Sequence, residues 1–151
     1  MKTAVIMIGI QGSGKSEFYR RYLAVDHVRV NLDTLHTRNN EQRLINSCFA
    51  DGKSFAVDNT NPTKAERAVY ISAAKAKGYR VVGYFMQSVL QDCIARNDER
   101  PGKANVPAKA IAATSNRLEL PSRSEGFDEL YYVQNDGKDM IFSEWREANA
   151  F

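Results

Sequence analysis

The sequence predicts one α/β domain, in which a parallel sheet of about five strands carries helices on both faces. Apolar runs alternate with amphipathic stretches along the chain, which is the pattern of repeated β-α-β units. The first run, residues 4–8, is wholly apolar, as expected of a strand buried on both faces. A glycine-rich loop at residues 9–16 follows that run directly and leads into an amphipathic stretch.

Length and composition indicate a single domain over residues 1–151. The 151 residues are 43% hydrophobic and 26% charged, an ordinary balance for a folded protein with one core. The net charge of +3 permits an anionic substrate, but a DNA-coating protein is usually more basic. The two cysteines and two histidines form no cluster, so we expect no zinc site and free thiols in a reducing cytoplasm. No apolar run is long enough to span a membrane.

The remaining elements follow from short apolar runs and helical periodicity. Pro62 before and Gly78 after the stretch 63–77 match the residue preferences of helix ends. Further strands are predicted at 28–30, 55–57, 80–86 and 131–133. Helices are predicted at 16–24, 40–50, 63–77, 88–98, 107–118 and 142–149. Ligands bind at the carboxyl ends of such parallel strands, so the residues just after each strand are the candidates for a site.

The loop at residues 9–16 has the G-x-x-x-x-G-K-S spacing of a phosphate-binding loop. Its glycines let backbone N–H groups point inward, and the next helix directs its positive end to the same point. Lys15 brings charge to the outer phosphates, and the Ser16 hydroxyl suits Mg²⁺. The residues expected to bind ATP are Gly9, Gln11, Gly12, Ser13, Gly14, Lys15 and Ser16.

Two carboxylates follow strands at the same edge of the predicted sheet. Asp33 comes after the 28–30 strand, where it could accept the proton of a hydroxyl that attacks a phosphate. A helix N-cap or a turn explains Asp33 equally well. Asp58 ends the 55–57 strand as a Walker B aspartate does, and it would hold Mg²⁺ with Ser16. The polar residues after it, 59–61, suit ligand contact and helix capping alike.

Arg96 and Arg100 lie four residues apart and so share one helix face. They begin a segment, about 96–118, that we expect to form a helical lid, and lid arginines neutralise charge on a moving phosphoryl group. For either arginine alone, a solvated helix end is the simpler interpretation. The loop at 135–137 is a candidate for contact with the nucleotide base.

These motifs together resemble the kinase domain of the polynucleotide kinase family, from Ile6 to about Val133. The resemblance rests on the phosphate loop, on V-N-L-D-T-L at 30–35 and on D-N-T-N-P at 58–62. Further pieces are E-R-A-V-Y-I at 66–71, Ala95-Arg96 with Arg100, and E-G-F at 125–127. The resemblance implies a three-layer P-loop kinase fold that transfers the γ-phosphate of ATP, with Mg²⁺, to the 5′-hydroxyl end of DNA or RNA.

The resemblance also implies roles for particular residues. Asp33 becomes the general base, and Arg96 or Arg100 becomes the lid arginine. Some members of the family carry an arginine three residues after the base, where this chain has His36. Arg38, two residues further on, is then the candidate for the acceptor phosphate. The acceptor side would further include Asp58, Asn59, Thr60 and Asn61.

Other functions fit the same loop. A kinase for a small acceptor, such as a nucleoside or another metabolite, would use the same phosphate loop and the same base. An ATP-dependent switch that transfers no phosphate is a third interpretation. The D-x-D-x-T motif of the family's partner phosphatase does not occur here, so we expect kinase activity alone. Such a lone kinase domain would suit repair in a bacterium or a phage-infected cell.

Overall fold

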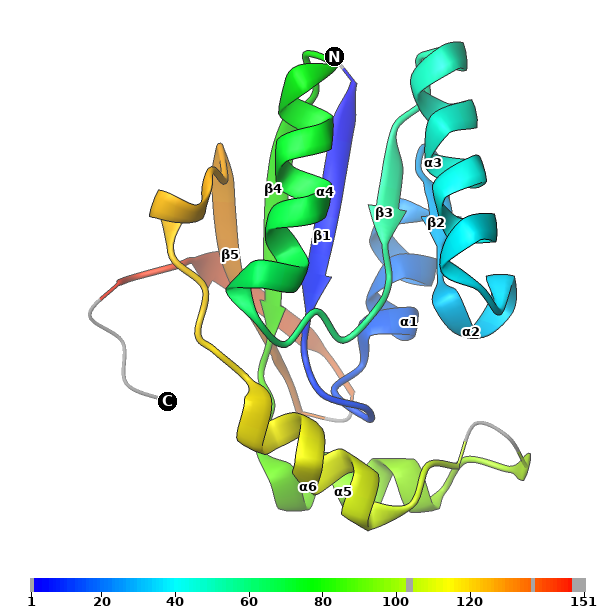
Figure 1. The fold of residues 1–151 in the computed structure, drawn as a ribbon. Coiled ribbons are helices and arrows are strands. Elements are labelled where there is room, and N and C mark those ends of the chain that lie inside the picture. The colour runs from blue at the N-terminus through cyan, green and yellow to red at the C-terminus, as the bar shows by residue number, and fades with distance from the viewer. Residues whose placement is uncertain (1, 103–104, 137, 148–151) are drawn as a thin grey trace.

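The computed structural model describes residues 2–102, 105–136 and 138–147, and its centre is a six-stranded sheet (Figure 1). The strands run in the order β2-β3-β1-β4-β5-β6, and the first five in this order are parallel. The last strand pairs antiparallel with its neighbour. The strands are β1 (Thr3–Ile8), β2 (Val28–Val30), β3 (Phe55–Val57), β4 (Arg80–Met86), β5 (Glu129–Asn135) and β6 (Met140–Glu144).

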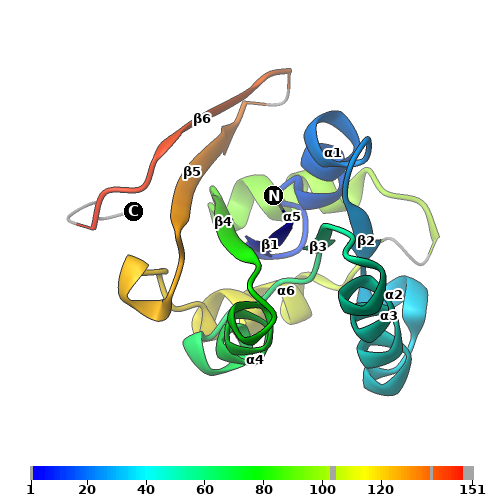
Figure 2. The same ribbon diagram turned by 90° about the horizontal axis from the view of Figure 1, so that it is seen from above.

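Helices lie on both faces of the sheet and across its carboxyl-terminal edge. Figure 2 shows α3 and α4 on one face and α1 on the other, while α5 and α6 cross beneath the ends of the strands in Figure 1. The helices are α1 (Lys15–Phe18), which continues as a π-helical turn (Tyr19–Leu23), α2 (Leu32–Leu35), α3 (Arg38–Asp51), α4 (Lys64–Ala76), α5 (Leu90–Asp98) and α6 (Ala108–Arg117). The predicted α/β class with three layers is therefore confirmed. Among the described residues, no helix is long and apolar enough to cross a membrane.

Alternation along β1 divides the core into two layers. Ala4, Ile6 and Ile8 are fully buried and pack with residues of α3 and α4. Val5 and Met7 point the other way, into the cluster that contains the apolar side of α1. Burial on both faces explains why this strand has no polar residue between positions 4 and 8.

The end of the chain differs from the prediction. The helix predicted at 142–149 is wrong, because Met140–Glu144 forms β6, which is paired with β5 through partners such as Val133 and Phe142. Positions 148 and 149 lie outside the described residues. The backbone of β5 would otherwise present an unpaired edge, and the β-prone side chains of Ile141 and Phe142 favour a strand there. The sheet therefore has six strands, one more than expected.

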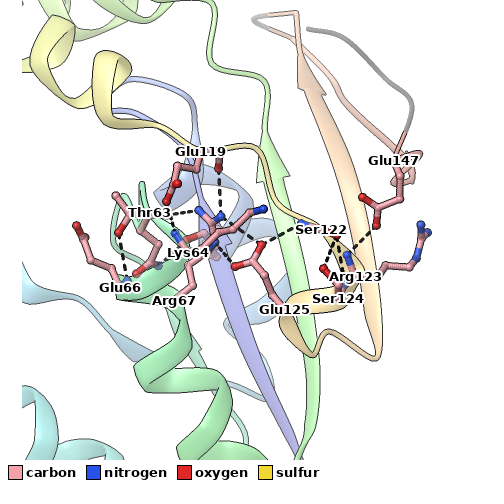
Figure 3. Close-up of polar contacts among 12 residues, drawn as sticks. Thr63, Lys64, Glu66, Arg67, Glu119, Ser122, Arg123, Ser124, Glu125 and Glu147 are labelled. Carbon is pink, nitrogen blue, oxygen red and sulfur yellow. Dashed lines mark hydrogen bonds and ion pairs between the residues drawn. The ribbon is translucent and has the colours of Figure 1, made fainter.

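Arg67, on α4, joins four segments of the chain behind the sheet edge (Figure 3). Its side chain is fully buried and pairs with Glu125 through bonds of 2.9 and 3.2 Å. It also donates to the carbonyl oxygens of Asn61 and Glu119 at 2.9 and 3.1 Å. Two pieces of the family resemblance that are far apart in sequence, residues 66–71 and 125–127, thus meet in one ion pair.

Candidate active site

The phosphate loop leaves β1 and curls in a way that only glycine permits. Gly12 and Gly14 have left-handed φ angles of 83° and 98°. A Cβ on Gly12 would lie 2.2 Å from the carbonyl oxygen of Cys93, and a Cβ on Gly14 would lie 2.6 Å from Asn135 Nδ2. The loop therefore fits against α5 on one side and the β5–β6 turn on the other. Asn135 belongs to the predicted base-contact loop, of which position 137 lies outside the described residues.

Polar atoms of the loop are buried without a hydrogen-bond partner. Among the described residues, Ser13 Oγ and Gln11 Oε1 accept and donate no hydrogen bond, although buried polar groups usually have one. The other end of the Gln11 amide donates to Thr114 Oγ1 of α6 at 3.1 Å. The Ser13 hydroxyl can donate a hydrogen bond, so together with the glycine backbone it fits an oxygen-rich anion such as a triphosphate.

Lys15 is a buried cation at the start of α1. Its Nζ donates to the loop's own carbonyl oxygens, to Gly9 at 2.8 Å and Ile10 at 3.1 Å. The pKa of Lys15 is lowered from 10.5 to about 8, mainly by burial and in part by the charge of Arg100, while the carboxylates of Asp58 and Asp33 act in the opposite direction. The charged groups of Asp33, Asp58 and Arg100 therefore all lie within electrostatic reach of the Lys15 ammonium.

The donors that would hold Mg²⁺ are Ser16 and Asp58. The Ser16 hydroxyl donates to Asp58 Oδ2 at 3.1 Å, and the Asp58 side chain is 1% exposed. The guanidinium of Arg29, on β2, donates hydrogen bonds to both groups and so places a positive charge where a metal ion would lie. Within the described ranges no three His, Cys, Asp or Glu side chains converge. One hydroxyl and one carboxylate match a metal whose other ligands are water and phosphate oxygens, so the residues present fit Mg²⁺.

Asp33 lies in the first turn of α2, and another residue caps that helix. Asn31 is the N-cap, because its Oδ1 accepts from Thr34 N at 3.1 Å. Asn31 Nδ2 also donates to the carbonyl oxygen of Asp58 at 2.6 Å, and this bond joins the start of α2 to the end of β3. The interpretation of Asp33 as an N-cap is therefore wrong. The Asp33 carboxylate is exposed, and its charge acts on Lys15.

The two arginines of the expected lid have different surroundings. Arg96 Nε donates to the carbonyl oxygen of Gly12 at 2.7 Å, so this side chain braces the phosphate loop from α5. Arg100, just beyond α5, is partly buried, and its charge lowers the pKa of Lys15 after the larger effect of burial. Arg96 thus contacts the backbone of the phosphate loop, whereas Arg100 acts on its lysine through charge.

The polar residues after β3 bind other parts of the protein. Asn59 accepts from Leu32 N at 2.9 Å, Asn61 donates to the Met7 carbonyl at 2.7 Å, and the Thr60 carbonyl accepts from Gly9 N at 3.1 Å. These bonds join the segment to α2, β1 and the phosphate loop. Asn61 also has a left-handed φ of 46°. The segment thereby fixes the carboxyl ends of neighbouring strands relative to one another.

Arg38 belongs to a polar cluster that lies beside Asn59. Arg38 Nη1 donates to Glu41 Oε1 at 3.0 Å and to the Tyr70 hydroxyl at 2.8 Å. Tyr70 and Asn59 in turn donate to the buried Glu41 carboxylate at 2.9 Å each. Burial, followed by the hydrogen bond and charge of Glu41, raises the pKa of Tyr70 to about 12. The Arg38 side chain stays 63% exposed, so part of it is open to solvent.

Sequence reasoning missed Arg29, Glu41, Tyr70 and Cys93. One indication of the role of Arg29 was present in the sequence, because a charged residue inside a short apolar strand needs a partner. Arg29 and Asn31 lie on the same face of the strand, so the partner is expected on that face. Glu41 gave none, since it occupies an ordinary position of an amphipathic helix, and Tyr70 appeared only within the 66–71 piece of the resemblance, with no role attached to it. The Cys93 contact is made by its backbone carbonyl, which a sequence pattern does not reveal.

The sheet order, the glycine-rich loop after β1 and the Ser16–Asp58 pair define a P-loop protein of the kinase type. A family model described as an AAA domain matches residues 37–121, which is more than half of the sequence. The chain therefore belongs to that family.

Two relatives with assigned names also match the chain. The bifunctional polynucleotide phosphatase/kinase of Schizosaccharomyces pombe is 26% identical over 135 residues, 85% of this chain and 33% of its own length. A protein of Acanthamoeba polyphaga mimivirus that is assigned the same activity in its name is 35% identical over 79 residues, 52% of this chain and 19% of its own. The chain thus spans a third or less of these relatives. The predicted resemblance to the polynucleotide kinase family is confirmed.

Solved structures share the fold at low sequence identity. Kti12 of Chaetomium thermophilum, in complex with ADP-AlF3, matches with a TM-score of 0.65 and 16% identity over 90% of this chain and 91% of its own. A gluconokinase from Sinorhizobium meliloti matches with a TM-score of 0.59 and 17% identity over 87% and 82%. These similarities extend to most of each chain, and they describe the fold alone.

Proposed function

We propose that this chain is an ATP-dependent polynucleotide kinase that phosphorylates the 5′-hydroxyl end of DNA or RNA. The observation that carries the phosphotransfer step is the convergence of charge at the sheet edge. There the charges of Asp33, Asp58 and Arg100 all act on the Lys15 ammonium. The nucleic-acid acceptor is supported by the names of the two relatives, which align with this chain over one part of their own length.

Each group has a distinct task in this proposal. Mg²⁺, when bound, would neutralise charge on the triphosphate oxygens, and Ser16 and Asp58 would hold it. The Asp33 carboxylate accepts the proton of the acceptor 5′-hydroxyl as the hydroxyl oxygen attacks the γ-phosphorus, and the bond from that phosphorus to the bridging oxygen breaks to release ADP. Lys15 and Arg100 stabilise negative charge on the phosphoryl group, and Arg96 keeps the loop backbone in place. We further propose that residues 96–118 form the lid that excludes water. The hydrogen bond from Gln11 of the phosphate loop to Thr114 of this segment supports the proposal.

A panel of acceptors tests the proposed activity. Labelled ATP is offered with a 5′-hydroxyl DNA oligonucleotide, its RNA counterpart, a nucleoside and gluconate, each with Mg²⁺. We expect label on the oligonucleotides. Label on a small molecule alone would reject the proposal in favour of a metabolite kinase, the second candidate, which the similarity to a gluconokinase fold supports.

Substituting the proposed base separates chemistry from binding. Asp33→Asn should lower turnover by about 10²–10⁴-fold, because a positioned general base contributes that much, and ADP should still raise the melting temperature. Asp51→Asn, at the exposed end of α3, is the matched control and should keep full turnover. Wild-type turnover in Asp33→Asn would remove this residue from the proposed mechanism.

A further inference from the structure

Arg29 forms a closed triangle with the two groups assigned to the metal. Its Nε donates to Asp58 Oδ2 at 2.8 Å, and its Nη2 donates to Ser16 Oγ at 2.9 Å. The Ser16 hydroxyl itself donates to the same Asp58 oxygen at 3.1 Å. The guanidinium therefore occupies one lone pair on each of the two oxygen atoms that a metal ion at this place would need.

Burial and charge explain why a cation lies here. The Asp58 side chain is 1% exposed, and a carboxylate so deeply buried requires a positive partner. Arg29 is 35% exposed, so its side chain can move into solvent without opening the core. Its other described contact is with the Tyr19 ring, whose centroid lies 6.0 Å from the guanidinium carbon, at the outer limit of a cation–π interaction. Electrostatic attraction, more than packing, holds Arg29 in place.

We infer that Arg29 is a resident counter-cation that competes with Mg²⁺ for the Ser16 hydroxyl and the Asp58 carboxylate. The inference rests on the proposed function through the assignment of these two groups to the metal. A hydroxyl oxygen that accepts a hydrogen bond from Arg29 and donates its own proton to Asp58 has one lone pair left. A divalent metal ion that takes these two donors would lie beside the positive guanidinium, so the repulsion between the two cations drives Arg29 to release both groups. Arg29 is thus a positioning residue that keeps the two metal donors together and lowers their affinity for Mg²⁺.

The competition predicts opposite effects of one substitution on stability and on metal affinity. In Arg29→Gln, Asp58 loses its counter-charge, so the metal-free protein should melt at a lower temperature than the wild type. The same variant should bind Mg²⁺ with affinity on the order of tenfold higher, because two charge-assisted hydrogen bonds no longer oppose the metal. As Mg²⁺ is added, its melting temperature should approach that of the wild type.

Thermal unfolding with increasing MgCl₂, at ionic strength held constant with NaCl and without nucleotide, measures both effects. Electron paramagnetic resonance of free Mn²⁺ gives the metal affinity directly. Arg80→Gln is the matched control, because Arg80 pairs with Glu129 at the exposed start of β4 and should not change the metal midpoint. Arg29→Lys keeps the charge but cannot bridge both oxygens, so its midpoint should fall between those of Arg29→Gln and the wild type.

Two results would overturn the inference. One is an equal metal midpoint in Arg29→Gln, Arg29→Lys and wild type. The other is a difference in melting temperature between Arg29→Gln and wild type that persists at saturating Mg²⁺, as a purely structural arginine would produce. If Arg29→Gln does not fold, the midpoint of Arg29→Lys decides alone. None of these measurements uses an acceptor, so failure to phosphorylate 5′ ends would leave their outcome readable.

Discussion

Lys15, in the phosphate loop, and Arg67, on α4, both carry positive charge into the interior of the protein. Lys15 is 9% exposed and Arg67 is 0% exposed. Arg67 meets the Glu125 carboxylate and two backbone carbonyls (Figure 3). Lys15 meets two carbonyls of its own loop, and burial lowers its pKa to about 8. A charge that the protein balances itself maintains structure, whereas a charge that it balances only in part is available to an anionic ligand.

The largest effect on stability should come from Arg67, whose charge the protein balances itself. Arg67→Leu should lower the free energy of unfolding by about 3–5 kcal/mol, because Glu125 would remain buried without its partner. Urea denaturation measures the change. Arg80→Leu is the control, since its pair with Glu129 is exposed and should contribute far less to stability. Equal losses in the two variants would show that burial does not distinguish these ion pairs.

Removing the charge of Lys15, which the protein balances only in part, should instead raise the free energy of unfolding. The pKa of Lys15 is about 8 in the folded protein, whereas the unperturbed value of 10.5 applies in the unfolded chain. The unfolded chain therefore holds the proton more tightly. Lys15→Met should therefore raise the free energy of unfolding at pH 7, by on the order of 1–3 kcal/mol. The gain should shrink as the pH rises from 8 to 10.5, where the wild type itself becomes more stable.

Urea denaturation at pH 7 and pH 10 tests this prediction, with Lys75→Met, which removes an exposed pair with Asp128, as the control. Lys15→Met should also lose the rise in melting temperature that ATP gives the wild type. A variant that is less stable than wild type at pH 7 would mean that the two carbonyl contacts outweigh the cost of burying the charge.

Nucleotide affinity should depend on the same proton. Above about pH 8 the free Lys15 loses its charge, so the Kd for ATP should rise by up to about tenfold for each pH unit. Isothermal titration calorimetry between pH 7 and 9.5 measures it. Lys15→Arg stays charged throughout, and its affinity should be flat over the same range. A wild-type curve as flat as that of Lys15→Arg would contradict the role given to Lys15.

The smallest effect should come from the cap of the helix that carries Arg67. Thr63 Oγ1 accepts from Glu66 N at 3.2 Å as the N-cap of α4. Thr63→Ala should lower the free energy of unfolding by about 1 kcal/mol and leave the Kd for ATP unchanged. Thr63→Ser, which keeps the hydroxyl, is the control. A change in ATP affinity would mean that the two regions are coupled through the 58–62 segment.

The fold was predictable wherever one local pattern determines one outcome. Residues 4–8 are apolar at every position, and the adjoining glycine loop has a spacing that few other structures need. The end of the chain was harder to predict. Helical and strand periodicity both fit residues 142–147, and the free edge of β5, which decides between them, is a property of the assembled sheet.

The candidate site was predictable in its residue types and less so in its contacts. Spacing and strand ends pointed to Lys15, Ser16 and Asp58, whose hydrogen bonds and charges the structure brings together. Whether Asp33 or Asn31 caps α2 depends on where the first turn begins, and a shift of two residues is beyond sequence patterns. The bonds of Arg29 could not be inferred, because they join β2, α1 and β3 across the sheet.

The close fit at Gly14 has a consequence for the order in which the protein matures. A Cβ there would meet Asn135 and Met140, so the start of α1 lies against the last hairpin of the sheet. Translation delivers the phosphate loop well before that hairpin. Segments so distant along the chain meet slowly, since contacts of large sequence separation form at a high entropic cost. The nascent chain on the ribosome therefore carries an incomplete nucleotide site until β5 and β6 have emerged.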